Sequence, residues 1–267
     1  MSRLGTVHKG VTDKPLRFLL YGVEGIGKSE LAAQFPNPIF LAAEDGVSHI
    51  DTTSIVPTGW LDAIAILSEL FHDPHEYKTL VVDTCRWLEG MCSQYVCELN
   101  KVPSLAHIGY GKGGPMVLAE FQKGMQWLSA LRNQRSMNIV LVGHADVKKF
   151  GNPEGDDYDR YSLLMDNKKL AEELKQWADI VGFYNFDATV SASDGMGTGK
   201  ATSLGQRLMH LERSVAYDAK NRFKMRSPLD MGASAGQGFE KLMAEYNKRP
   251  GASPAAAAAP TTPGEQS

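Results

Sequence analysis

Short apolar runs alternate along most of the chain with longer stretches whose apolar residues recur at helical spacing. The short runs predict buried strands, and the amphipathic stretches between them predict helices. We expect strands near residues 18–21, 38–42, 79–82, 138–142 and 180–186, and helices near residues 28–35, 60–71, 88–99, 117–131 and 170–177. Strands that alternate with helices are typical of an α/β fold with a mostly parallel sheet and helices on both faces.

The pattern changes after the fifth strand. Residues 189–190 and the alternating residues 208–211 flank a glycine-rich stretch at 194–200, which indicates an antiparallel ribbon at the edge of the sheet. A last helix is expected near 239–246. Residues 250–267 are mostly Ala, Pro, Gly and Thr, a composition that cannot build a core, so we expect a disordered tail. The predicted organisation is an extension at 1–14, one domain at 15–249 and this tail.

Composition and charge narrow the class of protein. The 267 residues are 43% hydrophobic, but no apolar run approaches the about 18 residues of a membrane span, and no secretory signal stands at the start. The three cysteines are odd in number and lack the spacing of metal ligands. We therefore expect reduced thiols, as in a cytoplasmic protein. A net charge of −3 excludes a globally basic nucleic-acid binder and leaves room for a local basic stripe.

A phosphate-binding loop follows the first predicted strand. The pattern G-x-x-x-x-G-K-[ST] lies between that strand and a helix, where a chance glycine-rich turn is a poor explanation. We expect its backbone N–H groups to face phosphates, its lysine to reach the β- and γ-phosphates of ATP, and its serine to bind Mg²⁺. The loop consists of Gly22, Val23, Glu24, Gly25, Ile26, Gly27, Lys28 and Ser29.

Carboxylates end two other predicted strands. Asp83 follows an apolar strand and is expected to hold Mg²⁺, although an aspartate there could also cap a helix. Many ATPases place a catalytic glutamate directly after that aspartate, but Thr84 occupies the position here. Glu44 stands after the second strand, and carboxyl ends of parallel strands meet at the ligand crevice. We therefore expect Glu44 to be the catalytic base, with Asp45 as a weaker rival.

At this point the sequence resembles the RecA-like ATPases, which carry their catalytic glutamate after the strand that follows the P-loop helix. In those proteins a polar residue at the end of the fourth strand senses the γ-phosphate, and the resemblance gives that role to His144. A structural histidine is the alternative. Lys220 and Arg222 resemble the K-x-R element of RecA-like hexameric helicases and RadA-type proteins, in which both cations reach a neighbouring subunit's ATP. A basic, solvated turn is the alternative for this pair.

Taken over residues 15–223, the chain resembles a family of phage-encoded RecA-like proteins, some of which are classed as single-strand annealing recombinases. Further resemblance lies in the segments 44–46, 110–113 and 143–144. The resemblance implies a RecA-like ATPase core that handles single-stranded DNA and self-associates into a ring or filament. It also implies a location in the cytoplasm of an infected bacterial host, and a single-strand-binding or replication protein as a possible partner.

Residues 145–161 are expected to form a long polar loop at the position of the DNA-binding loop of RecA-like proteins. Basic and aromatic residues suited to phosphate contact and base stacking are present, namely Lys148, Lys149, Phe150, Arg160 and Tyr161. Acidic residues offset them, namely Glu154, Asp156, Asp157 and Asp159. The prediction of DNA binding therefore rests mainly on the family resemblance.

Three functions fit these features. The first is an ATPase that acts on single-stranded DNA in recombination or annealing. The second is an ATP-dependent regulator or loader that binds a protein partner. The third, a small-molecule phosphotransferase, is disfavoured because the chain lacks an arginine-rich lid. Measuring the ATPase rate with and without single-stranded DNA separates the first two.

Overall fold

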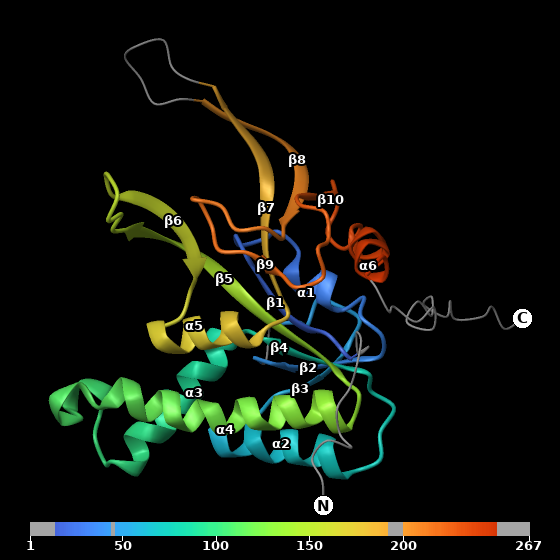
Figure 1. Ribbon diagram of the computed structural model, residues 1–267. Helices are drawn as coiled ribbons and strands as arrows, with labels where there is room; N and C mark the ends of the chain where they lie inside the picture. The colour runs from blue at the N-terminus through green and yellow to red at the C-terminus, as the bar shows by residue number, and fades with distance from the viewer. Residues whose placement is uncertain (1–13, 44–45, 192–199, 250–267) are drawn as a thin grey trace, which may run out of the picture.

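The computed structural model describes residues 14–43, 46–191 and 200–249 (Figure 1). Within them, a single twisted sheet forms the centre of the molecule. Its main path runs in the order β10 (Leu229–Gly232), β8 (Lys200–His210), β7 (Ile180–Ser191), β1 (Arg17–Gly22), β5 (Asn138–Phe150), β4 (Thr79–Asp83), β2 (Pro38–Ala42) and β3 (Thr53–Ile55). Two further strands join it: β6 (Tyr158–Leu163) pairs with β5, and β9 (Lys220–Asn221) pairs with β7.

The sheet has a parallel centre and an antiparallel edge. Strands β7, β1, β5, β4, β2 and β3 pair in parallel, whereas β8 pairs antiparallel with both β7 and β10. This confirms the predicted fold class, including the antiparallel ribbon at the edge. Strand β5 lies between β1 and β4, so the strand before the phosphate loop and the strand that ends at Asp83 are one strand apart.

Helices cover both faces of the sheet (Figure 1). One face carries α2 (Trp60–His72), α3 (Cys85–Leu99), α4 (Gly113–Gln134) and α5 (Lys168–Trp177), and the other carries α1 (Lys28–Ala32) and α6 (Phe239–Asn247). Short 3-10 turns, η2 (Leu105–His107) and η3 (Gly109–Gly111), connect α3 to α4. Alternate residues of β1 serve the two cores, because successive side chains of a strand point to opposite faces. Leu19 and Tyr21 pack in the first core, and Phe18 and Leu20 in the second.

One sequence prediction is wrong about the segment after His144. Instead of a long polar loop, β5 continues to Phe150 and pairs antiparallel with β6, which makes a β-hairpin of residues 145–163. A cross-strand pair of Phe150 and Tyr158, with ring centroids 5.2 Å apart, stabilises this pairing, and the acidic residues gather toward its turn. We call it the β5–β6 hairpin.

The base of the β5–β6 hairpin is held against the segment that precedes β9. Arg160 is only 4% exposed; it donates a hydrogen bond to Tyr217 O at 3.0 Å and pairs with Asp218 at 2.5 Å. The expectation that Arg160 is available to DNA phosphates is therefore wrong, because its guanidinium is used inside the protein.

Some expectations fall outside the described residues: the extension at 1–13, the pair Glu44 and Asp45, the ribbon's turn at 192–199 and the tail at 250–267. Among the helices that are described, none is both long and apolar enough to cross a lipid bilayer.

Candidate functional site

The phosphate loop connects the end of β1 to the start of α1, as the sequence pattern predicts. Two of its glycines are required by close approaches. A Cβ on Gly22 would lie 2.0 Å from the carbonyl oxygen of Tyr184 on β7. Gly27 has φ +93°, a left-handed conformation that favours glycine, and its Cβ would lie 2.6 Å from Cβ of Ala235. The loop therefore forms a tight cradle that side chains would obstruct.

Lys28 turns its ammonium group back into this cradle. Its Nζ donates hydrogen bonds to Val23 O at 2.7 Å and to Gly22 O at 3.2 Å, and the residue is only 6% exposed. Burial lowers the pKa of Lys28 to about 8, and the nearby carboxylates, chiefly Asp83, oppose that shift only in part. A desolvated cation of this kind gains most from an anion in the loop.

Ser29 and Asp83 meet beside Lys28. The Ser29 hydroxyl donates a hydrogen bond of 2.5 Å to Asp83 Oδ2 at the end of β4. Burial raises the pKa of Asp83, while the hydrogen bond from Ser29 and the charge of Lys28 act in the opposite direction. The two side chains offer hard oxygen ligands. Among the described residues no three His, Cys, Asp or Glu side chains form a cage, but Mg²⁺ at a phosphate site needs only one or two carboxylates.

The position after Asp83 has a structural role. The Thr84 hydroxyl accepts a hydrogen bond of 3.3 Å from Trp87 N and caps the start of α3.

Glu44 lies outside the described residues. The last residue of β2, Ala42, pairs in register with Asp83, so the chain leaves β2 beside the carboxylate of the proposed metal site. The role of Glu44 as catalytic base stays a prediction.

His144 lies next to the phosphate loop, in register with Gly22 on the neighbouring strand. The expected strand end is not there, because β5 continues past it. The ring is half-buried, and its Nδ1 is fully buried without a hydrogen-bond partner among the described residues. Burial, followed by the charge of Lys28, lowers the pKa of His144, so the neutral imidazole is favoured at neutral pH. A buried ring nitrogen without a partner suits a residue that a ligand completes.

Lys220 and Arg222 lie near the opposite end of β1 from the phosphate loop. Lys220 pairs with Val181 of β7, and its Nζ donates to two carbonyl oxygens at the end of α5, both at 2.8 Å. Arg222 pairs with Asp179 at 3.2 Å. The structure therefore separates both cations from the phosphate loop of their own chain. Contact with a neighbouring subunit's nucleotide, the role that the resemblance implies, stays a prediction.

Two residues beside the phosphate loop were not expected from the sequence. Arg207 on β8 donates a hydrogen bond of 2.8 Å from Nε to Ile26 O, and its guanidinium lies 5.2 Å from the ring centroid of Phe186. Ala235, after β10, packs on Gly27. Neither could be found from the sequence, because a polar residue in an alternating strand and an alanine in a turn are ordinary features there.

Comparison with known proteins identifies the family of the chain. A family model described as an AAA domain matches residues 14–223, which include the phosphate loop, Asp83, His144, Lys220 and Arg222. No curated protein sequence matches the chain significantly. Among solved structures, the crystal structure of the RadB recombinase aligns with 84% of this chain and 90% of its own, with 12% identity and a TM-score of 0.46. That likeness is too weak to support an argument about function.

Proposed function

We propose that this chain, which belongs to the AAA-domain family, is a Mg²⁺-dependent ATPase that acts on single-stranded DNA in recombination or annealing. The observation that carries the ATPase assignment is the meeting of Ser29 and Asp83 at 2.5 Å beside the buried ammonium of Lys28. Lys28 and Ser29 belong to the phosphate loop, whereas Asp83 ends β4, and together they match the groups that a nucleotide phosphate with its metal requires.

Each residue of the site has a distinct task in the proposed reaction. The loop's N–H groups and Lys28 bind the phosphates and hold the γ-phosphoryl group in place. Ser29 and Asp83 would hold Mg²⁺, which would supply neutralisation of the phosphate charge. Glu44 accepts the proton of the attacking water. His144, in its neutral form, hydrogen-bonds near the γ-phosphate position and responds to its loss.

The proposed reaction also involves a neighbouring subunit, which Lys220 and Arg222 would contact. The family resemblance suggests that they act on the ATP of a neighbouring chain in a ring or filament. A guanidinium supplied from a neighbouring chain stabilises the charge that develops on the transferred phosphoryl group. The side chain of Arg222 is 50% exposed, which leaves it accessible to such a neighbour.

Single-stranded DNA is proposed to contact the β5–β6 hairpin. Val147 and Phe150 are exposed on it, and Lys148 and Lys149 provide positive charge. Exposed aromatic and basic side chains are suited to base stacking and phosphate contact. On the basis of the resemblance to phage recombination proteins, the proposed location of this activity is the cytoplasm of an infected bacterium.

A protein-binding regulator or loader is the second candidate function. The observation in its favour is the run of exposed acidic residues near the turn of the β5–β6 hairpin, Glu154, Asp156 and Asp157, which repels a DNA backbone. ATP hydrolysis, measured with and without an oligothymidylate, separates the two. We expect the oligonucleotide to raise the rate, and replacement of Lys148 and Lys149 by Gln to reduce that rise. A basal rate that the oligonucleotide leaves unchanged supports the regulator instead.

A further inference from the structure

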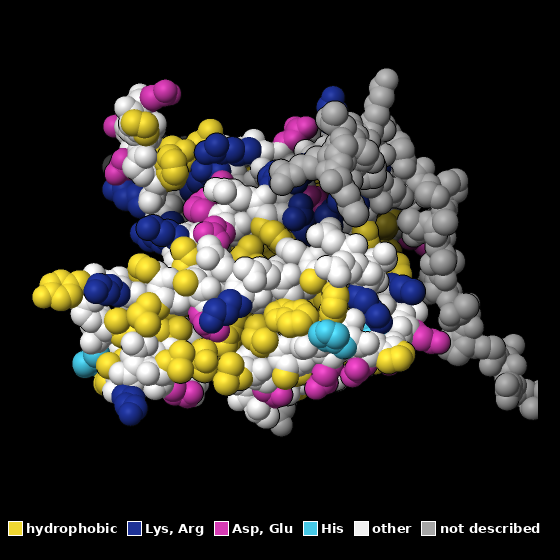
Figure 2. Space-filling model, turned by 60° about the horizontal axis from the view of Figure 1, so that its bottom comes forward, with side chains coloured by type: hydrophobic (Ala, Val, Ile, Leu, Met, Phe, Trp, Pro, Cys, Tyr) yellow, Lys and Arg dark blue, Asp and Glu magenta, His cyan; other side chains and the backbone are white. Residues whose placement is uncertain are grey.

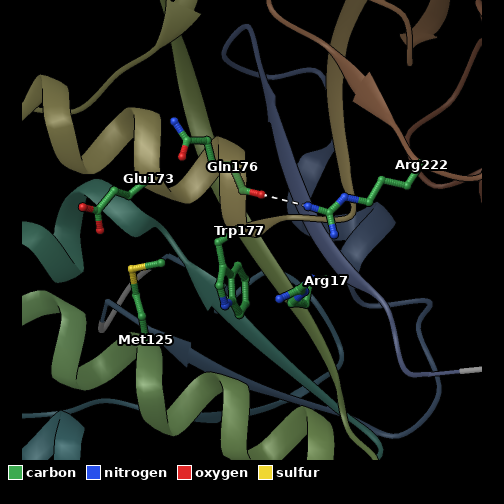
Figure 3. A pocket seen from close by; sticks show the side chains of 6 residues that line it. All are labelled: Arg17, Met125, Glu173, Gln176, Trp177 and Arg222. Atoms are coloured by element: carbon green, nitrogen blue, oxygen red, sulfur yellow. Dashed lines mark hydrogen bonds between the residues drawn. The ribbon is translucent and has the colours of Figure 1, made fainter. Parts of the chain in front are cut away.

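A second site lies near the opposite end of β1 from the phosphate loop. A pocket of about 420 Å³ is open to solvent between α4, α5 and the start of β1 (Figure 3). Its size is within the range of about 300–1,000 Å³ that ligand pockets occupy. It is lined by Arg17, Met125, Glu173, Gln176, Trp177 and Arg222. Of the residues that line it, the ATPase reaction proposed above assigns a task only to Arg222, toward the ATP of a neighbouring subunit.

Beneath this pocket, three guanidinium groups share one buried carboxylate. Asp179, whose side chain is 4% exposed, pairs with Arg17 at 2.7 Å, with Arg132 at 3.0 Å and with Arg222 at 3.2 Å. Burial acts to raise the pKa of Asp179, but the hydrogen bonds and charge of Arg17, together with the charge of Arg132, hold that pKa below its usual range. One negative charge cannot balance three positive ones, so the cluster carries a net positive charge, and two of its arginines, Arg17 and Arg222, line the pocket.

The ammonium group of Lys220 adds to this excess. It lies near the same cluster, and burial together with the charges of Arg222 and Arg17 lowers its pKa to about 8. Of the arginines that line the pocket, Arg222 is the more exposed, at 50% of its side chain, and Arg17 is 17% exposed. An incoming anion therefore meets Arg222 first and Arg17 behind it.

The rest of the pocket lining carries no positive charge. Trp177 lies between the two sides, with the Arg17 guanidinium 5.1 Å from its ring centroid. Met125 of α4 and Glu173 of α5 lie on the side away from the arginines (Figure 3). The carboxylate of Glu173 accepts hydrogen bonds of 2.9 Å from Gln122. The pocket thus offers cationic donors on one side, an apolar centre, and a carboxylate acceptor on the other side.

We propose that this pocket binds an acidic peptide segment of a protein partner. A carboxylate of the peptide pairs with Arg222 and Arg17, since guanidinium groups bind carboxylates through paired hydrogen bonds. An apolar side chain of the peptide packs on Trp177 and Met125, and a backbone N–H group of the peptide donates to Glu173.

Nucleic acid fits the same walls less well. A phosphodiester backbone carries acceptors alone, so it has nothing to donate to the carboxylate of Glu173, whereas a peptide has backbone N–H groups. Nucleic-acid grooves are also extended and basic. Figure 2 shows one face of the molecule, on which Lys and Arg side chains are interspersed with acidic and hydrophobic ones.

Fluorescence anisotropy of a labelled peptide tests the proposal. The probe is a short peptide of alternating Asp and Phe, compared with its counterpart of alternating Asn and Phe, on the full-length protein without nucleotide. We expect the acidic probe to bind at least about tenfold more tightly than the amide probe, since charge-assisted hydrogen bonds are the stronger ones. Equal binding of the two probes, or no binding of the acidic one, overturns the proposal.

Two variants locate the binding. Gln176→Glu places a negative charge in the pocket at an exposed side chain and leaves the Asp179 cluster intact; we expect binding of the acidic probe to weaken at least about tenfold. Arg222→Gln should weaken it similarly. Lys169→Gln, which removes a charge from an exposed position of α5 outside the pocket, is the matched control and should bind as wild type does.

Two results contradict this location. The first is that Gln176→Glu binds the acidic probe as wild type does. The second is that the two pocket variants lose binding of an oligothymidylate but keep binding of the acidic peptide. Because no nucleotide is present, a failure here leaves the proposed ATPase unaffected. Failure of the ATPase assay likewise leaves this binding unaffected.

Discussion

The Ser29 hydroxyl donates a hydrogen bond of 2.5 Å to the carboxylate of Asp83, and it joins residues that are 54 positions apart in the sequence. Both oxygens are ligands that Mg²⁺ prefers. The two expected metal ligands are thus in direct contact at the end of β4.

Replacement of Lys28 by Ala tests the phosphate loop. The variant loses the buried ammonium group that contacts the phosphates, so ATP turnover should fall by at least about 100-fold while the fold is kept. Steady-state phosphate release and circular dichroism measure the two properties. Lys101→Ala, at an exposed turn, is the matched control and should hydrolyse ATP normally. Turnover at the wild-type rate by folded Lys28→Ala contradicts the assignment.

The Ser29 and Asp83 pair should determine the dependence on Mg²⁺. Asp83→Asn removes the metal-binding charge, and Ser29→Ala removes the second ligand. We expect both variants to need at least about tenfold more Mg²⁺ for half-maximal ATPase activity. A titration of Mg²⁺ at fixed ATP measures this, with Asp73→Asn as a control at an exposed position. An unchanged titration curve for Asp83→Asn shows that this carboxylate does not hold the metal.

Glu44 and Asp45 can be separated by isosteric substitution. Glu44→Gln should bind ATP with Mg²⁺ but hydrolyse it at least about 100-fold more slowly, because the attacking water loses its base. Asp45→Asn should have a smaller effect. Nucleotide binding by a fluorescent ATP analogue, measured together with turnover, distinguishes a binding defect from a catalytic one. An inactive Asp45→Asn protein beside an active Glu44→Gln protein reverses the assignment.

The lowered pKa of Lys28 predicts how stability depends on pH. The pKa is about 8 in the folded chain and 10.5 for an ordinary lysine. Between these values the unfolded chain keeps a proton that the folded chain has released, so the contribution of Lys28 to folding stability rises with pH. Below pH 8 Lys28 is charged in the folded chain too, so the full free-energy cost of burying its charge lowers the stability of the fold.

Lys28→Met removes that cost. Without nucleotide, the variant should be more stable than wild type by up to about 3 kcal/mol below pH 8, and the difference should shrink as the pH approaches 10.5. Urea unfolding of both proteins at several pH values measures it, and groups that titrate equally in the two proteins cancel. A difference that stays constant across this range means that Lys28 is not desolvated.

A mixture of two inactive variants tests action between subunits. Arg222→Ala should bind ATP normally but hydrolyse it slowly, and mixing it with Glu44→Gln should restore part of the activity. In mixed assemblies some sites combine an intact Glu44 of one subunit with an intact Arg222 of its neighbour. Specific activity should also rise with protein concentration. If activity is independent of concentration and the mixture stays inactive, Arg222 serves only the contacts within its own chain.

The sequence predicted the fold well where its pattern was regular. The apolar run before Gly22 and the glycines after it determined both a strand and a loop, because few conformations satisfy that spacing. The same holds for Asp83 at a strand end. The β5–β6 hairpin was missed because its residues are polar and charged, and its pairing depends on the cross-strand contact of Phe150 with Tyr158. Periodicity does not report such contacts.

The surroundings of the site were less predictable than its motifs. Arg207 reaches Ile26 only because β8 folds back along β7, and Asp179 gathers arginines from three distant segments. These contacts depend on tertiary packing between elements whose order in the sheet is not written in any local pattern. The residues of a short catalytic motif can therefore be predicted from the sequence, whereas the tertiary contacts that hold the motif in place are found only in the structure.

The contacts of the phosphate loop with Tyr184, Arg207 and Ala235 have a consequence for protein synthesis. The loop leaves the ribosome well before the residues that shape it. A nascent chain that has reached only β5 carries the complete motif without its supporting contacts. We therefore expect the nucleotide-binding site to mature only after Ala235 has been translated.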